Sequence, residues 1–392
     1  MMWGRLRSGT DRDASRADWM ELFFDLVFVA LIGQLAAGLR TDPSFGEILK
    51  FLALFASVWW SWVNLTYTVN VQLGMSRRTL AGYMLAAMAA VGAIAVAAPE
   101  AVGGRAWLFA LGNAGLRCVM LVLWTRRSWT TSVASRVRLL SYNGATAAIW
   151  AASAFLPAPV DYAFWAVAIL CEVVLLVASA PGLLRRVNTL NADHLADRFG
   201  TLVIIALGES VLAVVLTLSG AMTPIAAVTA GLGLIVTAGI AWSMFMFGID
   251  AMRDGLESLA ARDDSRGIVE TFAFLPYFLV AGVMLLAGAL STAVRAPLIP
   301  LPPAAAVSLG AGVALAYAAN ALISARYGVR ARFVLSWALP AVLLPLASIP
   351  LALTLPAAEA VGGMAVVLLA IVLIAEALAR RSHAAGTTEG RR

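Results

Sequence analysis

The feature that most constrains this chain is a series of apolar blocks, each about 20 residues long, the length that an α-helix needs to cross a bilayer. Only 13% of the 392 residues are charged, against about 25% in a soluble domain. Twelve blocks can be delimited, at about 20–39, 47–69, 79–98, 105–124, 138–157, 160–181, 199–219, 224–248, 267–293, 304–324, 333–355 and 361–380. The sequence therefore predicts an all-α polytopic membrane protein with about twelve transmembrane helices, and the lipid bilayer as its first partner.

The positions of the basic residues predict an orientation. If the N-terminus is cytoplasmic, all but five of the 28 Lys and Arg residues fall in cytoplasmic segments; the exceptions are Arg40, Lys50, Arg105 and Arg295 outside and Arg117 within a block. Cytoplasmic loops of membrane proteins carry such an excess of basic residues. We therefore expect both termini in the cytoplasm. No basic stripe interleaved with aromatic residues occurs, so we expect no nucleic acid as a partner.

Two related segments open the first and the seventh block. When Asp197–Ser210 is aligned without gaps to Trp19–Gln34, Asp197 falls on Glu21, and apolar residues match further along. This spacing predicts two parallel six-helix repeats. The expected organisation is a polar cytoplasmic arm (1–18), a first half (19–181), a cytoplasmic connector (182–198), a second half (199–380) and a disordered tail (381–392).

A small set of ionisable residues lies within or at the ends of the apolar blocks. Charged groups in a membrane helix are costly and normally face protein or water, so they are candidates for a functional site. The candidate set for a polar pocket is Glu21, Asp25, Arg117, Glu172, His194, Asp197, Arg198, Glu209 and Asp250.

Two arrangements are expected within this set. Arg117 should pair with Asp25, Glu172 or Glu209, because an unpaired arginine at that depth is unfavourable. Glu21, Asp25, Arg198 and Glu209 should share one pocket between the first and seventh helices. A buried carboxyl group can carry a proton or act as a general acid. The alternative is that these residues only clasp helices together.

The segments Glu21–Val29 and His194–Ser210 resemble the two signatures of the bacterial low temperature requirement A family. The resemblance extends over the whole chain and implies a polytopic protein of the bacterial inner membrane, with a largely undefined activity. Glu21, Asp25, His194, Arg198, Gly208 and Glu209 match the pattern, whereas Asp197 stands where glutamate is expected. Two positions depart from it: no acidic residue follows Tyr67–Asn70, and Phe274–Tyr277 contains no histidine. A proton mechanism that used those two positions is therefore in doubt.

Three functions remain open at this point. The first is a proton-coupled transporter or permease for a small molecule, which suits two halves with buried acids. The second is a membrane enzyme that acts on a lipid or isoprenoid, with Trp59, Trp60 and Trp62 stabilising cations, although no Asp-rich diphosphate-binding motif occurs. The third is a structural or regulatory membrane protein.

We expect no cofactor and no metal. Walker and dinucleotide-binding fingerprints do not occur, and one histidine without a nearby cysteine does not provide a zinc site. Cys118 and Cys171 lie in apolar blocks, where single cysteines usually behave as small hydrophobic residues.

Overall fold

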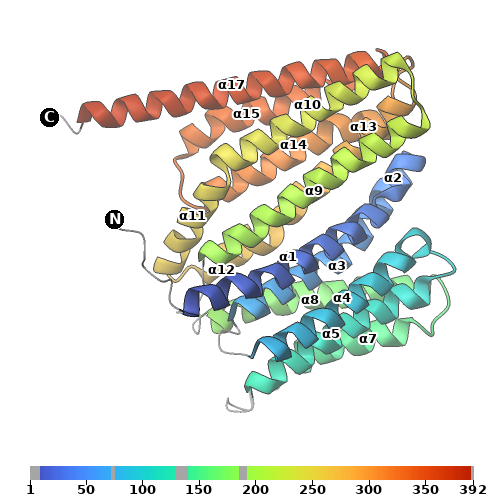
Figure 1. Cartoon of the computed structure of the whole chain (residues 1–392), viewed down its shortest axis with the longest axis vertical. Helices are drawn as coiled ribbons and strands as arrows, with labels where there is room; N and C mark the ends of the chain where they lie inside the picture. Colours follow the sequence, from blue (N-terminus) through green and yellow to red (C-terminus); the bar gives the residue numbers. More distant parts are fainter. Residues whose placement is uncertain (1–8, 72–75, 129–139, 185–191, 390–392) are drawn as a thin grey trace, which may run out of the picture. The chain divides into compact units, whose positions relative to one another are not determined.

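A computed structural model describes residues 9–71, 76–128, 140–184 and 192–389. In these ranges the chain consists of helices joined by short turns, and they contain no β-strand. Figure 1 shows the helices as long rods in an all-α arrangement. Within a membrane only helices satisfy their backbone hydrogen bonds without a sheet partner, so this architecture follows from the apolar composition.

Nine helical segments of the described chain are long and apolar enough to cross a membrane. They are Phe45–Val69, Arg78–Glu100, Ala106–Thr125, Ala192–Gly220, Pro224–Met246, Arg266–Arg295, Pro303–Arg326, Ala331–Ala352 and Ala357–Ala377. Each corresponds to one of the predicted blocks, so the protein is a multi-pass membrane protein.

The other three predicted spans are not among these nine segments. The block 20–39 is divided between α1 (Gly9–Leu35) and α2 (Ala37–Thr41). In the described part of the block 138–157, which begins at Leu140, a π-helix, η2 (Leu140–Ala145), is followed by α7 (Thr146–Ser153). The block 160–181 lies in α8 (Val160–Leu184). These three spans stay predictions, and so does the repeat relationship between the two halves.

The contacts divide the chain into two compact units that do not follow the predicted halves. The first unit consists of Met1–Leu35, Ser57–Ser179 and Arg186–Ile205, and the second of Ala36–Ala56, Ala180–Arg185 and Ala206–Arg392. Three long helices, α3 (Phe45–Val71), α8 and α9 (Ala192–Gly220), therefore contribute residues to both units.

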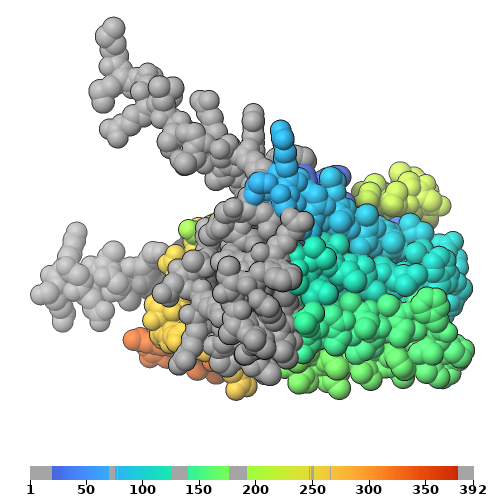
Figure 2. All heavy atoms as spheres, turned by 90° about the horizontal axis from the view of Figure 1, so that it is seen from below, coloured from blue at the N-terminus to red at the C-terminus, as the bar shows by residue number. Residues whose placement is uncertain are grey.

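The first unit contains α1, the later part of α3, α4 (Arg77–Ala97), η1 (Ala98–Glu100), α5 (Ala106–Ser128), η2, α7, α8 and the start of α9. Helix α4 begins at Ser76, whose side chain accepts a hydrogen bond from the backbone N–H of Thr79. It then packs closely on α5, because Gly112 presents no side chain to Ile94. In the space-filling view of Figure 2, the light-blue to green side chains of this unit lie directly against one another.

The second unit is arranged around α13 (Leu275–Arg295), which is buried along almost its whole length. Its remaining helices are α2, the start of α3, the end of α8, the end of α9, α10 (Pro224–Phe247), α11 (Ile249–Ala261), α12 (Ser265–Val269), η3 (Glu270–Phe274), α14 (Pro303–Arg326), α15 (Ala331–Ala347), α16 (Ile349–Ala352) and α17 (Ala357–Glu389). Helices α13 and α14 approach closely because Gly282 and Gly312 face each other's backbone. A hydrogen bond of 2.8 Å between the hydroxyls of Ser243 and Tyr317 joins α10 to α14.

Two ends of predicted segments differ from the structure. Helix α9 begins at Ala192, inside the predicted connector 182–198, of which residues 185–191 lie outside the described ranges. Helix α17 runs to Glu389, into the predicted disordered tail. Residues 1–8 of the predicted arm and 390–392 of the tail also lie outside the described ranges.

Candidate functional site

Two helices of the first unit each present a pair of ionisable side chains one turn apart. Helix α1 carries Glu21 and Asp25, and α9 carries His194 and Arg198. His194 Nε2 lies 2.9 Å from Glu21 Oε2, Arg198 Nη1 lies 3.4 Å from the same oxygen, and Arg198 Nη2 lies 2.9 Å from Asp25 Oδ1. The acids of one helix thus meet the bases of the other, and we call these four residues the acid–base cluster.

Helix α3 completes the surroundings of this cluster. Trp62 Nε1 donates a hydrogen bond of 2.9 Å to Asp25 Oδ1, and Thr66 Oγ1 accepts a longer one of 3.5 Å from Arg198 Nη2. The Trp62 indole is itself fully buried and packs against the rings of Phe28 and Trp59. These apolar neighbours exclude water, so the charges of the cluster interact more strongly than they would at a protein surface.

The four side chains become steadily more buried along the cluster. The side chain of His194 is 24% exposed, those of Glu21 and Arg198 are 7% and 6% exposed, and that of Asp25 is fully buried. Asp25 is therefore the innermost member, and His194 is the member that water can reach most easily.

The cluster is incompletely hydrogen-bonded. Within the described chain, Asp25 Oδ2, Arg198 Nε and Arg198 Nη1 are buried and have no hydrogen-bond partner, although Nη1 remains within ion-pair distance of Glu21. Buried polar atoms without partners are rare, because each one costs about 1–3 kcal/mol. The site therefore has unused capacity to accept a proton or to bind a polar ligand.

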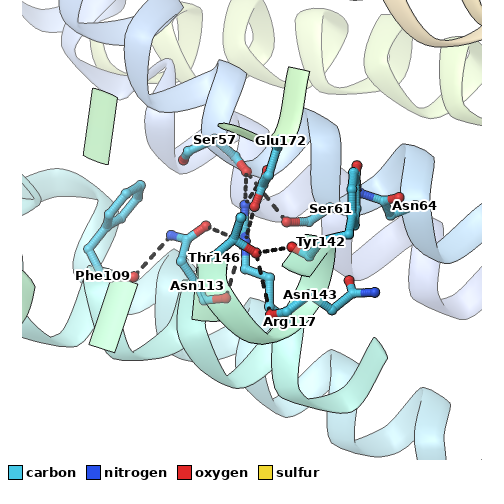
Figure 3. A network of polar contacts seen from close by, with 10 residues as sticks. All are labelled: Ser57, Ser61, Asn64, Phe109, Asn113, Arg117, Tyr142, Asn143, Thr146 and Glu172. Atoms are coloured by element: carbon cyan, nitrogen blue, oxygen red, sulfur yellow. Dashed lines mark hydrogen bonds and ion pairs between the residues drawn. The ribbon is translucent and has the colours of Figure 1, made fainter. Parts of the chain in front are cut away.

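A second buried pair in the first unit is fully bonded. Arg117 on α5 binds Glu172 on α8 through two contacts, Nε to Oε1 at 2.5 Å and Nη2 to Oε2 at 3.0 Å. Its Nη1 donates to the backbone and side-chain oxygens of Asn113, and Nη2 also donates to the carbonyl of Ser57 (Figure 3). The guanidinium lies 5.2 Å from the centre of the Trp150 ring. The predicted pairing of Arg117 is confirmed, with Glu172 as the acid.

The two buried pairs of the first unit differ in what they can do. Figure 3 shows the Arg117 guanidinium close to Glu172 and Asn113, and each of its three nitrogens, Nε, Nη1 and Nη2, donates to at least one acceptor. An ion pair whose hydrogen bonds are all formed within the pair and its neighbours joins helices, but it offers no unpartnered oxygen to bind a proton. The acid–base cluster, with its unpartnered atoms, is the better candidate for a functional site.

The remaining predicted site residues lie elsewhere. Glu209 belongs to the second unit, where its Oε1 lies 3.3 Å from Arg40 Nη1 and both side chains are partly buried. Asp197 is exposed on α9. Asp250 lies in α11, and its side chain is outside the described part of the structure.

Three residues of these sites were not selected from the sequence. The sequence indicates Trp62 only as a cation-stabilising ring and Arg40 only as a loop charge, and it gives no role to Thr66. Trp62 and Thr66 are one turn apart on α3, and this polar spacing in an apolar helix is a signal that could have indicated them. Among the described residues, no group of three His, Cys, Asp or Glu side chains is placed to hold a metal ion.

Comparison with known proteins places the chain in a family. The sequence model of the bacterial low temperature requirement A protein (LtrA) matches residues 16–373. The chain belongs to the LtrA family. The whole acid–base cluster and the Arg117 pair lie within the matched LtrA region.

A relative supports the same placement without adding a function. A protein of Rhizobium meliloti (strain 1021) that is named as uncharacterized is 27% identical over 216 residues, which cover 52% of this chain and 51% of that protein. The chain thus spans about half the length of the curated relative that it matches. No solved structure matches this LtrA-family chain.

Proposed function

We propose that this LtrA-family protein is a proton-coupled transporter or permease, and that Asp25 carries the proton. The observation that supports this assignment is the fully buried Asp25 carboxyl group, whose Oδ2 has no hydrogen-bond partner in the described chain. The other oxygen, Oδ1, accepts hydrogen bonds from both Trp62 and Arg198. Oδ2 is therefore the atom that is free to bind a proton while the carboxyl group stays in place.

The charges of the cluster support the same function. Glu21 and Asp25 together carry two negative charges when ionised, whereas Arg198 supplies one positive charge. Excess charge inside a membrane is unfavourable, so the excess negative charge favours the binding of a proton. His194, which is partly exposed and bonded to Glu21, provides the route by which that proton reaches the interior.

The enzyme hypothesis has less support. A cation-stabilising aromatic residue has to present its face to the substrate. Trp59 and Trp62 are instead fully buried, and their stacked rings have centroids 5.3 Å apart. The Trp62 N–H also donates a hydrogen bond to Asp25. Both indoles are thus used in packing and in holding the carboxyl group.

The proposed topology is twelve spans in two parallel six-helix halves, with both termini on the cytoplasmic side of the bacterial inner membrane. Its support is the distribution of basic residues and the match between the segments that begin at Trp19 and Asp197. Reporter fusions to the connector 182–198 test it: a reporter active outside the cytoplasm would contradict this topology.

Infrared difference spectroscopy on the purified protein tests the proton carrier. We expect the wild type to show a protonated carboxyl band that appears as the pH is lowered and disappears as it is raised, and Asp25→Asn to lack that band. Asp42→Asn is the matched control, because Asp42 is exposed in a loop. If the band is unchanged in Asp25→Asn, Asp25 is not the proton carrier.

Proteoliposomes that contain a pH-sensitive dye test the coupling to transport. Under an imposed membrane potential, we expect one or more members of a panel of amino acids, sugars, organic acids and nucleosides to start proton movement in the wild type and in Asp42→Asn. Asp25→Asn should abolish it. Solute uptake that continues in Asp25→Asn at the wild-type rate would contradict proton coupling through this residue.

A further inference from the structure

We infer that Arg198 binds the carboxylate group of the transported solute, taking it in exchange for Asp25 when Asp25 accepts its proton. This inference rests on the proposed proton-coupled function and adds the class of substrate. It follows from a comparison of the two buried arginines in the first unit.

Arg117 shows how a buried guanidinium is satisfied in this protein. The Nε and Nη2 groups form one edge of the guanidinium, and in Arg117 both groups of that edge bind Glu172, one to each carboxylate oxygen. Such a paired contact is the arrangement in which arginine binds carboxylates most strongly. It leaves neither Nε nor Nη2 of Arg117 without an acceptor.

The same edge of Arg198 is only half used. Its Nη2 binds Asp25 Oδ1, but its Nε has no hydrogen-bond partner in the described chain, and neither has Asp25 Oδ2. Trp62 Nε1 donates a second hydrogen bond to Asp25 Oδ1, and in this position the Asp25 carboxyl group accepts a hydrogen bond from Nη2 of Arg198 but not from its Nε. A carboxylate that is not tied to α1 can bind both Nε and Nη2, and so can replace Asp25 with a better contact.

Proton binding makes this replacement possible without adding charge to the membrane interior. With Asp25 ionised, the charges of Glu21, Asp25 and Arg198 sum to one negative charge, apart from any charge on His194. When a proton binds Asp25 Oδ2 and a solute carboxylate takes the Nε and Nη2 groups of Arg198, the sum of charges is the same. Trp62 can still donate to Oδ1 of the neutral carboxyl group. One carboxylate and one proton are therefore bound together.

Carboxylates can reach the site from two sources, and benzoate and decanoate serve as probes for them. Benzoate represents water-soluble carboxylates, and decanoate represents fatty acids that enter from the bilayer. The protein is used as the full chain in lipid nanodiscs, in weakly buffered solution that contains a pH-sensitive dye. We expect one or both probes to bind, each with uptake of about one proton per bound carboxylate, and chloride at the same ionic strength to cause none.

Arg198→Lys keeps the positive charge but removes the paired edge. The loss of one hydrogen bond to a charged group should weaken binding of the active probe about tenfold or more. Arg332→Lys is the control, because Arg332 is exposed at the start of α15, and it should bind like the wild type. If Arg198→Lys does not fold, the proton count of the wild type still decides the question.

The outcomes separate this inference from the proposed function. Binding of either probe without proton uptake, equal binding by folded Arg198→Lys, or no binding of either probe would overturn carboxylate exchange. If Asp25 nevertheless shows its infrared titration, the proton-carrier function stands and only the substrate class is wrong. If Asp25 shows no titration, the proposed function itself falls.

Discussion

The buried pair of Arg117 and Glu172 gives the sharpest prediction about stability. Both side chains are only 2% exposed, and they join α5 to α8 inside the first unit. In Glu172→Gln the amide oxygen can still accept one hydrogen bond from the guanidinium, but its NH2 group faces Arg117 as a second donor. The substitution therefore removes one charge-assisted hydrogen bond and the only negative charge bonded to Arg117 among the described residues.

The magnitude follows from those two losses. One hydrogen bond between charged groups contributes about 1.5–3 kcal/mol, and removal of one partner from a buried ion pair costs about 3–5 kcal/mol in total. We expect Glu172→Gln to lower the free energy of unfolding by about 3 kcal/mol or more. Replacement of both partners, as Arg117→Met with Glu172→Leu, should cost less than either single substitution, because no unpaired charge is left.

Unfolding of the purified protein in mixed micelles by SDS, followed by tryptophan fluorescence, measures these differences. Glu257→Gln is the control, because Glu257 is exposed on α11 and the same change there should alter stability by less than about 0.5 kcal/mol. A Glu172→Gln protein as stable as this control would refute the reasoning. So would a double variant that is destabilised by the sum of the two single substitutions.

Two further predictions use the same unfolding measurement. In Gly312→Ala the new Cβ would lie 2.7 Å from the carbonyl oxygen of Gly282, so we expect the free energy of unfolding to fall by about 1–3 kcal/mol. Gly363→Ala is the control, because a Cβ there meets no neighbouring atom within 4 Å, and it should be neutral or stabilising. Equal effects of the two substitutions would contradict the close packing of α13 on α14. Arg40→Gln breaks the pair with Glu209, in which the side chains of Arg40 and Glu209 are 21% and 18% exposed. It should lower the free energy of unfolding by only about 1 kcal/mol or less. A loss as large as that of Glu172→Gln would contradict this and show that the pair is shielded from water.

Helix positions could be predicted from the sequence alone because they depend on local properties. The length and apolarity of a segment decide whether it can span a bilayer, and neither depends on the neighbouring helices. Nine predicted blocks accordingly reappear as candidate spans in the described chain. The same local argument failed at the start of α9 and at the end of α17, where the helix continues into polar sequence. In α9, the contacts of His194 and Arg198 with α1 stabilise the first turns.

The sequence also determined that the buried charges need partners, but not which partners they have. The cost of a charge in a membrane is a property of one residue, so the pairing of Arg117 with an acid followed from its position in the block. Whether that acid was Asp25, Glu172 or Glu209 depended on how the helices are packed and rotated. Only the tertiary structure assigned Glu172 to Arg117 and Arg40 to Glu209.

The acid–base cluster shows the same division. The spacing of Glu21 and Asp25, and that of His194 and Arg198, placed each pair on one face of its helix. The structure added that these faces meet within the first unit, that Trp62 holds Asp25 Oδ1, and that Oδ2 is left without a partner in the described chain. Hydrogen bonding of a single oxygen atom depends on distances of a few ångströms between helices remote in sequence, and a one-dimensional pattern does not contain those distances.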